Sequence, residues 1–373
     1  MFRQSSTLSV TAGSQAPHPE APSRQEHTFD VGTRKSRLAL AQTQIFVNEA
    51  IKHFPENVFV VKARDTAAGD IDKVTPFKDM PVKNIWTHEL EAMLVEKELD
   101  ILVHSLKGSQ KSSGKFFLTD LLIEPDVPTQ LPPNCEIGGV TEREDPRDCF
   151  VLKAGRPACK IQDLPAGAVI GTSSIRRTAQ IALKYPHLVV RDMRGNMETR
   201  LRKLDAEDSG FDALILAAAG LLRIDLGHRI TQYLDSKDGD MLHAVGQGAI
   251  GIENRERDDV VTSIVKKVNH VPTFYAVTAE RRLLRTIEGG CSAPLGVETT
   301  WVDNEHLNFK AIVVSVDGKE YAEYETTEEV KSVDDAERLG QTVAVEILRR
   351  GADKILAEIK AKKPTTVADL EEK

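Results

Sequence analysis

The chain has 373 residues, of which 40% are hydrophobic and 28% are charged, and its formal net charge is −8 at pH 7. This length and composition predict a folded protein of two or three domains. The acidic balance argues against a general nucleic-acid binder, which is usually basic. No apolar run approaches the ~20 residues that cross a bilayer, which argues against a membrane protein.

The segment 1–27 is rich in Ser, Pro, His and Gln and has no continuous apolar stretch. It does not resemble a secretory signal. Its arginines and serines are typical of a transit peptide, whereas Glu20, Glu26 and the prolines argue against one. We therefore expect a disordered tail on a cytoplasmic protein.

From residue 28 onward, short apolar segments alternate with amphipathic ones. The expected strands are residues 58–62, 100–105, 149–152, 168–170, 188–191, 211–216, 249–253 and 307–316. The expected helices are residues 38–51, 86–98, a segment that opens at Ile175, residues 275–287 and one or two helices within 335–360. This alternation predicts an α/β fold, in which ligands bind at the carboxyl ends of the strands.

Polar and basic residues gather where several of these strands end, in residues 33–36, 104–107, 172–177 and 191–200. Between Arg176 and Lys203 there are eight basic residues and two acidic ones. Arginine binds carboxylate or phosphate through two parallel hydrogen bonds, and the N–H groups at a helix start also bind anions. We expect a deep cleft for a polyanion between two domains. The alternatives are a solvated basic helix face and, for Arg191, a structural ion pair.

The cysteines are Cys135, Cys149, Cys159 and Cys291, and none forms a CxxC pair, so we expect neither a zinc site nor a disulfide framework. Cys291 follows two glycines and precedes Ser292, Ala293 and Pro294. Glycines let the backbone turn sharply and expose the next side chain, which suits covalent attachment. The alternative is a small buried thiol.

A series of motifs, in this order, resembles the porphobilinogen deaminase family, also called hydroxymethylbilane synthases. The motifs are residues 31–36, 86–91, 104–107, 126–132, 142–148, 171–177, 194–196, 199–201, 244–249 and 288–294. The resemblance implies two α/β lobes like those of periplasmic binding proteins and a small α+β C-terminal domain. The implied limits are a disordered tail at 1–27, domain 1 at 28–145 and 246–266 with an insertion at 108–125, domain 2 at 146–240 and domain 3 at 268–373.

The resemblance also implies an enzyme of haem biosynthesis that joins four porphobilinogen molecules into hydroxymethylbilane and releases ammonia. Its cofactor is dipyrromethane, held by a thioether that falls here on Cys291. The implied catalytic residues are Asp126, Lys107 and Arg34. The implied cofactor-binding residues are Cys291, Arg176, Arg177, Ser174 and Lys107. The implied substrate-binding residues are Arg34, Ser36, Gln42, Arg194, Arg200 and Arg223. No metal, nucleic-acid or membrane partner is implied, and the protein is expected to be a monomer.

One departure from the family pattern lies at the catalytic aspartate, which normally follows the lysine of the HSLK motif directly. Here Gly108 follows Lys107, and residues 108–125 intervene before the motif resumes at Asp126. This segment has 18 residues, so reading through it keeps the frame, and its codons permit splice signals. We predict that it is a retained intron. The alternative function is therefore a protein that binds the cofactor or a pyrrole but is catalytically impaired.

Overall fold

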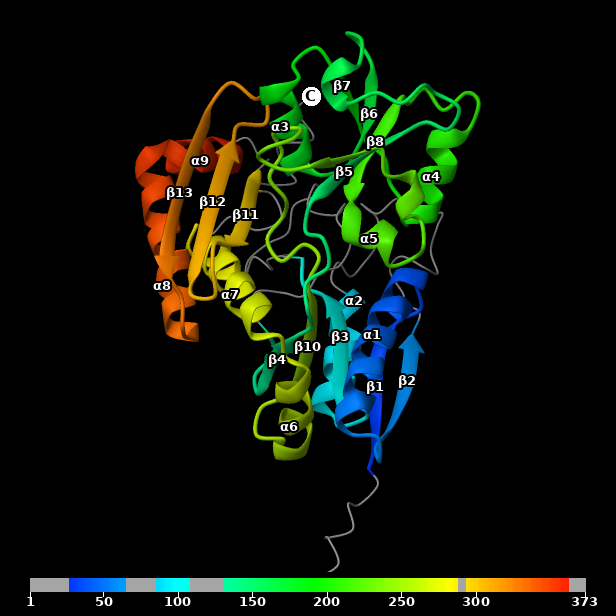
Figure 1. The fold of residues 1–373 in the computed structure, drawn as a ribbon, viewed down its shortest axis with the longest axis vertical. Helices are drawn as coiled ribbons and strands as arrows, with labels where there is room; N and C mark the ends of the chain where they lie inside the picture. The colour runs from blue at the N-terminus through cyan, green and yellow to red at the C-terminus, as the bar shows by residue number, and fades with distance from the viewer. Residues whose placement is uncertain (1–26, 65–84, 108–130, 288–292, 362–373) are drawn as a thin grey trace, which may run out of the picture.

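The structure is a computed structural model, and it describes residues 27–64, 85–107, 131–287 and 293–361 (Figure 1). Residues 1–26 of the predicted tail, the segment 108–125, Asp126 and Cys291 lie outside these described residues. The described chain forms two five-stranded sheets and one three-stranded sheet, each with its own helices. We call the two larger units lobe 1 and lobe 2, and the third unit the C-terminal domain.

Lobe 1 is built on a sheet with the strand order β2-β1-β3-β10-β4. Its strands are β1 (Thr28–Arg34), β2 (Val58–Arg64), β3 (Ile101–Ser105), β4 (Cys135–Val140) and β10 (Ile250–Arg255). β1 is parallel to β2 and β3, whereas β10 is antiparallel to β3 and β4. Because β10 comes much later in the chain than its neighbours, the chain leaves lobe 1 and returns to complete its sheet.

Helices cover both faces of this sheet. α1 (Arg37–His53) and α6 (Asp259–Val268) pack with Phe46, Ile101 and Ile252 in one apolar cluster. α2 (Ile85–Val95) contributes Leu90 and Leu94 to a second cluster. α1 begins at Arg37 because the Ser36 hydroxyl accepts a 3.2 Å hydrogen bond from the Ala39 N–H, which satisfies an otherwise unpaired donor.

Lobe 2 has the strand order β7-β6-β8-β5-β9. Its strands are β5 (Asp148–Leu152), β6 (Val169–Gly171), β7 (Val189–Arg191), β8 (Ala213–Ala217) and β9 (Gln232–Leu234). Its helices are α3 (Ile175–Lys184), α4 (Met197–Asp205) and α5 (Ala218–Leu222), with short 3₁₀ turns at Ile161–Asp163 and Gly227–Arg229. β6 is parallel to β7 and β8, and β5 runs antiparallel to β8. The apolar side chains divide between the two faces, so both faces are buried.

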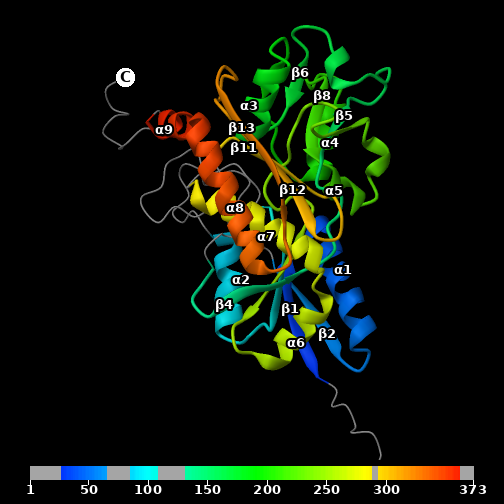
Figure 2. The same cartoon turned by 60° about the vertical axis from the view of Figure 1, so that its left-hand side comes forward.

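The C-terminal domain packs an antiparallel sheet against helices. The strands are β11 (Leu295–Trp301), β12 (His306–Val314) and β13 (Tyr321–Glu329), and the helices are α7 (Val271–Thr286), α8 (Val333–Ile347) and α9 (Asp353–Ala361). A π-helical turn at Leu348–Ala352 joins α8 to α9. Figure 2 shows α8 and α9 on the outer side of this sheet. Its other face meets lobe 2, because Ile312 and Val314 cluster with Ala179 and Leu242.

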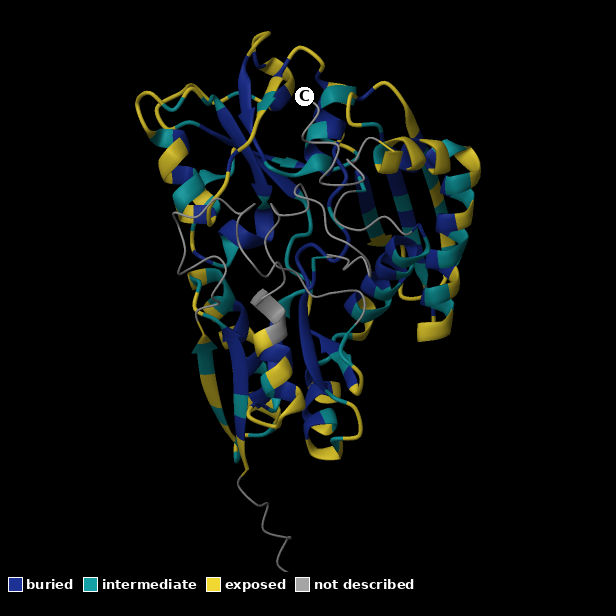
Figure 3. Ribbon diagram, turned by 180° about the vertical axis from the view of Figure 1, so that it is seen from behind, coloured by how far each residue is buried: buried dark blue, intermediate teal, exposed yellow. Residues whose placement is uncertain are grey.

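Each unit therefore has its own apolar core. Phe46, Phe150 and Phe309 are fully buried, one in the cluster of each unit. Replacing a buried phenylalanine with alanine typically costs ~3–5 kcal/mol of stability. Figure 3 shows the inner strands of both lobes as mainly buried, and the edge strand β2 and the outward helix faces as largely exposed or half-buried. The predicted architecture of two α/β lobes and a small α+β C-terminal domain is confirmed.

Two segments connect the lobes: residues 141–147 lead from β4 to β5, and residues 235–249 lead from β9 back to β10. The returning segment contains Gly246 and Gly248, whose φ angles are +67° and +86°. A Cβ atom on Gly246 would lie 2.2 Å from the Leu106 carbonyl oxygen, and one on Gly248 would lie 2.4 Å from that of Glu144. Glycine is required at both positions because an L side chain has neither the space nor the favoured backbone angle.

Candidate functional site

The predicted polar clusters lie at the strand ends that face the connecting segments. Arg34 is the last residue of β1, and Lys107 follows the end of β3, which is parallel to β1. In lobe 2, residues 172–177 follow β6 and residues 192–200 follow the parallel strand β7. Because β10 and β5 run antiparallel to these strands, the connecting segments enter each sheet at the end where the parallel strands finish. The structure thus brings segments distant in sequence to the same strand ends of each sheet.

Arg176 and Arg177, predicted to bind the cofactor, are almost fully buried near the start of α3, at 4% and 3% exposure. Each makes an ion pair with Asp148, the first residue of β5, at 2.7 Å and 2.8 Å. Burial alone would raise the pKa of Asp148, but the two guanidinium groups outweigh it and hold that pKa well below its ordinary value. Asp148 is therefore ionised throughout the physiological pH range.

Arg176 and Arg177 share the carboxylate of Asp148. Arg176 Nη1 also donates to the Leu242 carbonyl, and Arg177 Nη1 donates to that of Ile215. Arg176 Nη2 is buried and has no hydrogen-bond partner among the described residues. A buried donor without a partner costs free energy, so this atom fits an anionic group such as a cofactor carboxylate. The helix cap Ser174 lies next to the pair and is half-buried.

The other predicted residues of lobe 2 lie nearer the surface. Arg194 is exposed and pairs with Asp192 at 2.6 Å. Arg200 is half-buried in α4, where its Nε donates to the Gly195 carbonyl at 2.6 Å. Arg191 lies over the Phe211 ring at 5.7 Å, a cation–π contact. These side chains are more exposed to solvent than the buried pair on α3.

In lobe 1, Arg34 and Lys107 are half-buried at neighbouring strand ends. Ser36 caps α1, and Gln42 is buried in the same helix at 5% exposure. The Leu106 N–H donates to the Ala249 carbonyl at 2.9 Å, so the strand end before Lys107 is held against the returning segment. A movement of that segment would therefore shift the backbone next to Lys107.

Arg223, predicted to bind substrate, contacts the same segment. Its Nη2 donates to the Gly248 carbonyl at 2.7 Å. Burial lowers the pKa of Arg223 to about 10, although the charge of Glu144 opposes this shift. The guanidinium remains charged at neutral pH, and Arg223 joins lobe 2 to the returning segment.

Sequence reasoning missed a second buried ion pair at the junction of all three units. Arg143 Nη1 contacts Glu280 of α7 at 2.7 Å, and its Nε donates to the Gln247 carbonyl. Glu280 also accepts hydrogen bonds from the Gly246 N–H and the Thr299 hydroxyl. No motif near Glu280 pointed to this role, because its partners lie far away in the sequence.

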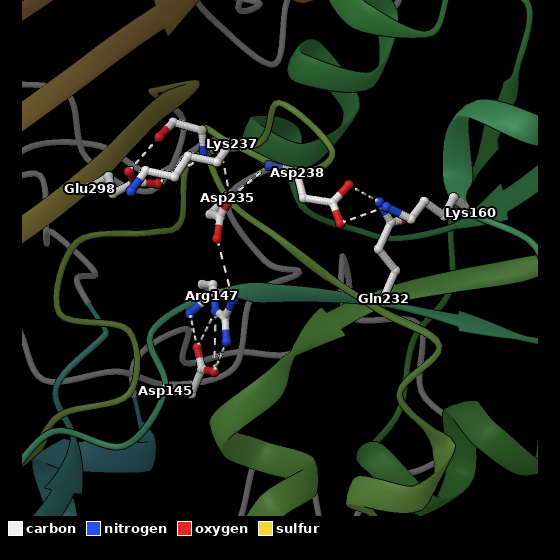
Figure 4. Close-up of polar contacts among 9 residues, drawn as sticks. Asp145, Arg147, Lys160, Gln232, Asp235, Lys237, Asp238 and Glu298 are labelled. Carbon is white, nitrogen blue, oxygen red and sulfur yellow. Dashed lines mark hydrogen bonds and ion pairs between the residues drawn. The ribbon is translucent and has the colours of Figure 1, made fainter.

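A third polar group joins lobe 2 to the C-terminal domain. Figure 4 shows Arg147 between Asp145 and Asp235, with ion pairs of 2.6 Å and 3.3 Å. The hydrogen bonds to Asp145 are the main cause that raises the pKa of Arg147 above its ordinary value. Next to Asp235, Ser236 donates through its N–H and hydroxyl to Glu298 of β11. The start of the loop after β9 is thus held by Arg147 on one side and by the C-terminal domain on the other.

Two predicted residues cannot be located, since Asp126 and Cys291 lie outside the described residues. In the chain, Cys291 falls between the end of α7 and the start of β11. Within the described ranges, no group of three or more His, Cys, Asp or Glu residues is arranged to hold a metal ion. None of the helices in that part of the chain is long and apolar enough to span a membrane.

Comparison with known proteins gives the context for this geometry. Residues 29–117 and 120–263 match the family model "Porphobilinogen deaminase, dipyromethane cofactor binding domain", and residues 274–349 match "Porphobilinogen deaminase, C-terminal domain". The chain belongs to the porphobilinogen deaminase family. The first family match includes residues 108–117 and 120–125 and leaves only 118 and 119 unmatched. Most of the segment 108–125 is therefore aligned with the family model.

Curated relatives agree over nearly the full length. A porphobilinogen deaminase of Neurospora crassa is 46% identical over 90% of this chain and 94% of its own length. One from Yarrowia lipolytica is 46% identical over 88% and 92%, and one from Eremothecium gossypii is 43% identical over 90% and 98%. The resemblance inferred from the motifs is confirmed.

Proposed function

We propose that this chain is a hydroxymethylbilane synthase of tetrapyrrole biosynthesis. It joins four porphobilinogen molecules head to tail, releases ammonia at each addition and yields hydroxymethylbilane after hydrolysis. Family membership over both matched domains supports this activity. The structural observation that supports it most is the buried Arg176–Arg177 pair, in which both guanidinium groups contact the Asp148 carboxylate and Arg176 Nη2 has no hydrogen-bond partner among the described residues.

The substrate explains why this surface is rich in arginine. Porphobilinogen has an acetate and a propionate, so every added pyrrole brings two negative charges. A growing chain of such rings must be held by cations, because a buried carboxylate without a partner costs several kcal/mol. Arginine also binds the planar carboxylate through two hydrogen bonds, so it orients the pyrrole ring as well as neutralising its negative charge.

The residues divide into three roles in this proposal. Arg176, Arg177, Ser174 and Lys107 hold the carboxylates of dipyrromethane, which is bound to Cys291 as a thioether and supplies the pyrrole carbon to which the first substrate is joined. The residues that bind substrate and the growing chain are Arg34, Ser36, Gln42, Arg194, Arg200 and Arg223. Asp126 accepts hydrogen bonds from pyrrole N–H groups and stabilises the positive charge that develops on the reacting ring.

The domain limits inferred from sequence belong to the same proposal: 28–145 with 246–266, 146–240 and 268–373. The return of β10 to the lobe 1 sheet supports the split first domain. We propose that the protein acts as a monomer in the cytoplasm on a small molecule, without a nucleic-acid or membrane partner. The net charge of −8 supports the exclusion of nucleic acid.

The experiment that tests the function measures two quantities on the purified full-length chain. Intact-mass spectrometry should show an added mass equal to dipyrromethane, located on the peptide that contains Cys291. Incubation with porphobilinogen should consume it and release one ammonia per ring. An added mass without consumption would favour the impaired, cofactor-binding alternative, and the absence of both would overturn the proposal.

A further inference from the structure

Asp148 stands at the centre of the buried polar group described above. Its side chain is fully buried, and Oδ2 accepts a 2.7 Å hydrogen bond from Arg176 Nη1. Oδ1 accepts 2.8 Å hydrogen bonds from Arg177 Nη2 and from Gln247 Nε2. Both carboxylate oxygens are therefore used, and three side chains from two different segments converge on one residue.

The carboxylate sets the orientation of both arginines. Each guanidinium is held at two points: Asp148 is one, and a backbone carbonyl, of Leu242 for Arg176 and of Ile215 for Arg177, is the other. Leu242 is itself held by Gln180, whose amide donates to its carbonyl and accepts from its N–H. With these contacts made, Arg176 Nη2 is left as a buried donor with no partner in the described chain. The arrangement presents a fixed donor instead of a flexible side chain.

The same carboxylate is connected to the segment that joins the lobes. Gln247 lies between Gly246 and Gly248, and its Nε2 donates both to Asp148 and to the Pro146 carbonyl. The Gln247 carbonyl accepts from Arg143, which is paired with Glu280 of α7. Movement of the segment 246–248 would therefore pull on the acceptor that orients the arginines.

We propose that Asp148 is a positioning residue that holds Arg176 and Arg177 in the orientation that binds a cofactor carboxylate, and that Gln247 couples this orientation to the returning segment. The inference rests on the proposed function, since it assigns the arginines to the cofactor. It adds a residue that touches neither substrate nor cofactor and acts only through its neighbours. A dedicated acceptor is needed because two adjacent guanidinium groups repel each other in a buried site.

The test compares Asp148→Asn with Asp205→Asn in the full-length protein. The control is in the same lobe, where Asp205 makes a two-point ion pair with Arg229 at 2.9 Å and 3.0 Å. Both variants should unfold at a lower temperature than wild type. Only Asp148→Asn should also lose cofactor, with the fraction of folded protein that carries the dipyrromethane mass reduced about ten-fold or more, because both buried guanidinium groups lose the shared carboxylate that orients them. Equal cofactor content in both folded variants would overturn the proposal.

A second variant, Gln247→Met, keeps both ion pairs and removes only the link to the returning segment. It should retain most of the cofactor but lower kcat more than it changes the KM for porphobilinogen, and partly elongated intermediates should accumulate on the protein. This variant tests the coupling even if Asp148→Asn does not fold, because a wild-type kcat without accumulated intermediates would overturn it. Wild-type protein without the added mass would instead overturn the proposed function and this inference with it.

Discussion

Arg37 of α1 and Glu198 of α4 form an ion pair of 2.9 Å that joins lobe 1 to lobe 2. Arg37 also donates to the Ile224 carbonyl at the end of α5. The neighbours of this pair in sequence, Ser36 and Arg200, are proposed to bind substrate. The contact therefore ties together two parts of the candidate site that lie 161 residues apart.

The first prediction concerns this pair. Arg37→Gln should change the free energy of unfolding by less than about 1 kcal/mol, since both side chains are half exposed and screened by solvent. It should raise the KM for porphobilinogen, because the two lobes lose a direct contact beside the substrate residues. Lys52→Gln, which removes the exposed pair with Glu49 in the same helix, is the matched control and should leave KM unchanged. Equal KM values for the two variants would contradict the role of Arg37.

The second prediction concerns the thioether. Cys291→Ser should abolish both the dipyrromethane mass and turnover, since a hydroxyl is a much poorer nucleophile than a thiolate. Cys159→Ser is the control, because Cys159 is partly exposed in lobe 2 and should leave both quantities unchanged. Intact-mass spectrometry and porphobilinogen consumption are the measurements. Full turnover by Cys291→Ser would remove this cysteine from the mechanism.

The third prediction separates cofactor binding from elongation. Arg176→Leu or Arg177→Leu should prevent cofactor assembly, because each leaves a carboxylate without its cation in a buried site. Arg200→Leu, at a half-exposed position of α4, should retain the cofactor mass and lose turnover. The cofactor content of each folded variant is the deciding measurement. Wild-type cofactor content in both α3 variants would show that these arginines have only a structural role.

The fourth prediction concerns Gly246. Gly246→Ala places a methyl group against the Leu106 carbonyl at a positive φ angle, so it combines a clash with backbone strain. Gly155→Ala is a matched control, because its φ is +83° and nothing lies within 4 Å of the added carbon. Strain alone costs about 1–2 kcal/mol, and Gly246→Ala should cost clearly more than Gly155→Ala in denaturant unfolding. Equal losses would show that the returning segment moves away from β3 at little cost.

The fifth prediction concerns residues 108–125. The family pattern places the catalytic aspartate directly after Lys107, where consecutive Cα atoms are ~3.8 Å apart. Deleting 108–125 restores that sequence and should raise turnover by about 100-fold or more, the usual effect of restoring one preorganised charged group. The transcript across codons 107–126 is the independent check. Comparable activity of the two forms, or a mature transcript that retains the segment, would make it a genuine part of the protein.

Most strands and helices of the lobes could be predicted, with limits shifted by one to a few residues. α6 was missed because its run of Val and Ile is also typical of a strand. Its local helix signals are the Asp258 cap and the helical spacing of its buried residues Val261, Ile264, Val265 and Val268. β13 was missed because it is the edge strand of its sheet and is rich in charged residues, and its pairing with β12 is tertiary information that the local sequence does not carry.

The motifs predicted polar clusters that the structure places at strand ends, but they did not predict the contacts within these clusters. Asp148 belongs to a recognised motif, yet nothing in the sequence tells that it is fully buried and paired with both Arg176 and Arg177. The two residues of the Arg143–Glu280 pair are 137 positions apart, and their contact could likewise not be predicted from the sequence. Such pairs depend on how the lobes and the C-terminal domain meet, which is a property of the whole fold.

The late arrival of β10 has a consequence for synthesis on the ribosome. β10 lies between β3 and β4, so the lobe 1 sheet stays incomplete until residue 255 has left the ribosome. The strands of lobe 2, from residue 148 to residue 234, are continuous in the chain and emerge as one complete sheet before that point. Since contiguous units fold first during translation, the second lobe should form ahead of the first, and the gap beside β3 should remain a site for chaperones until β10 fills it.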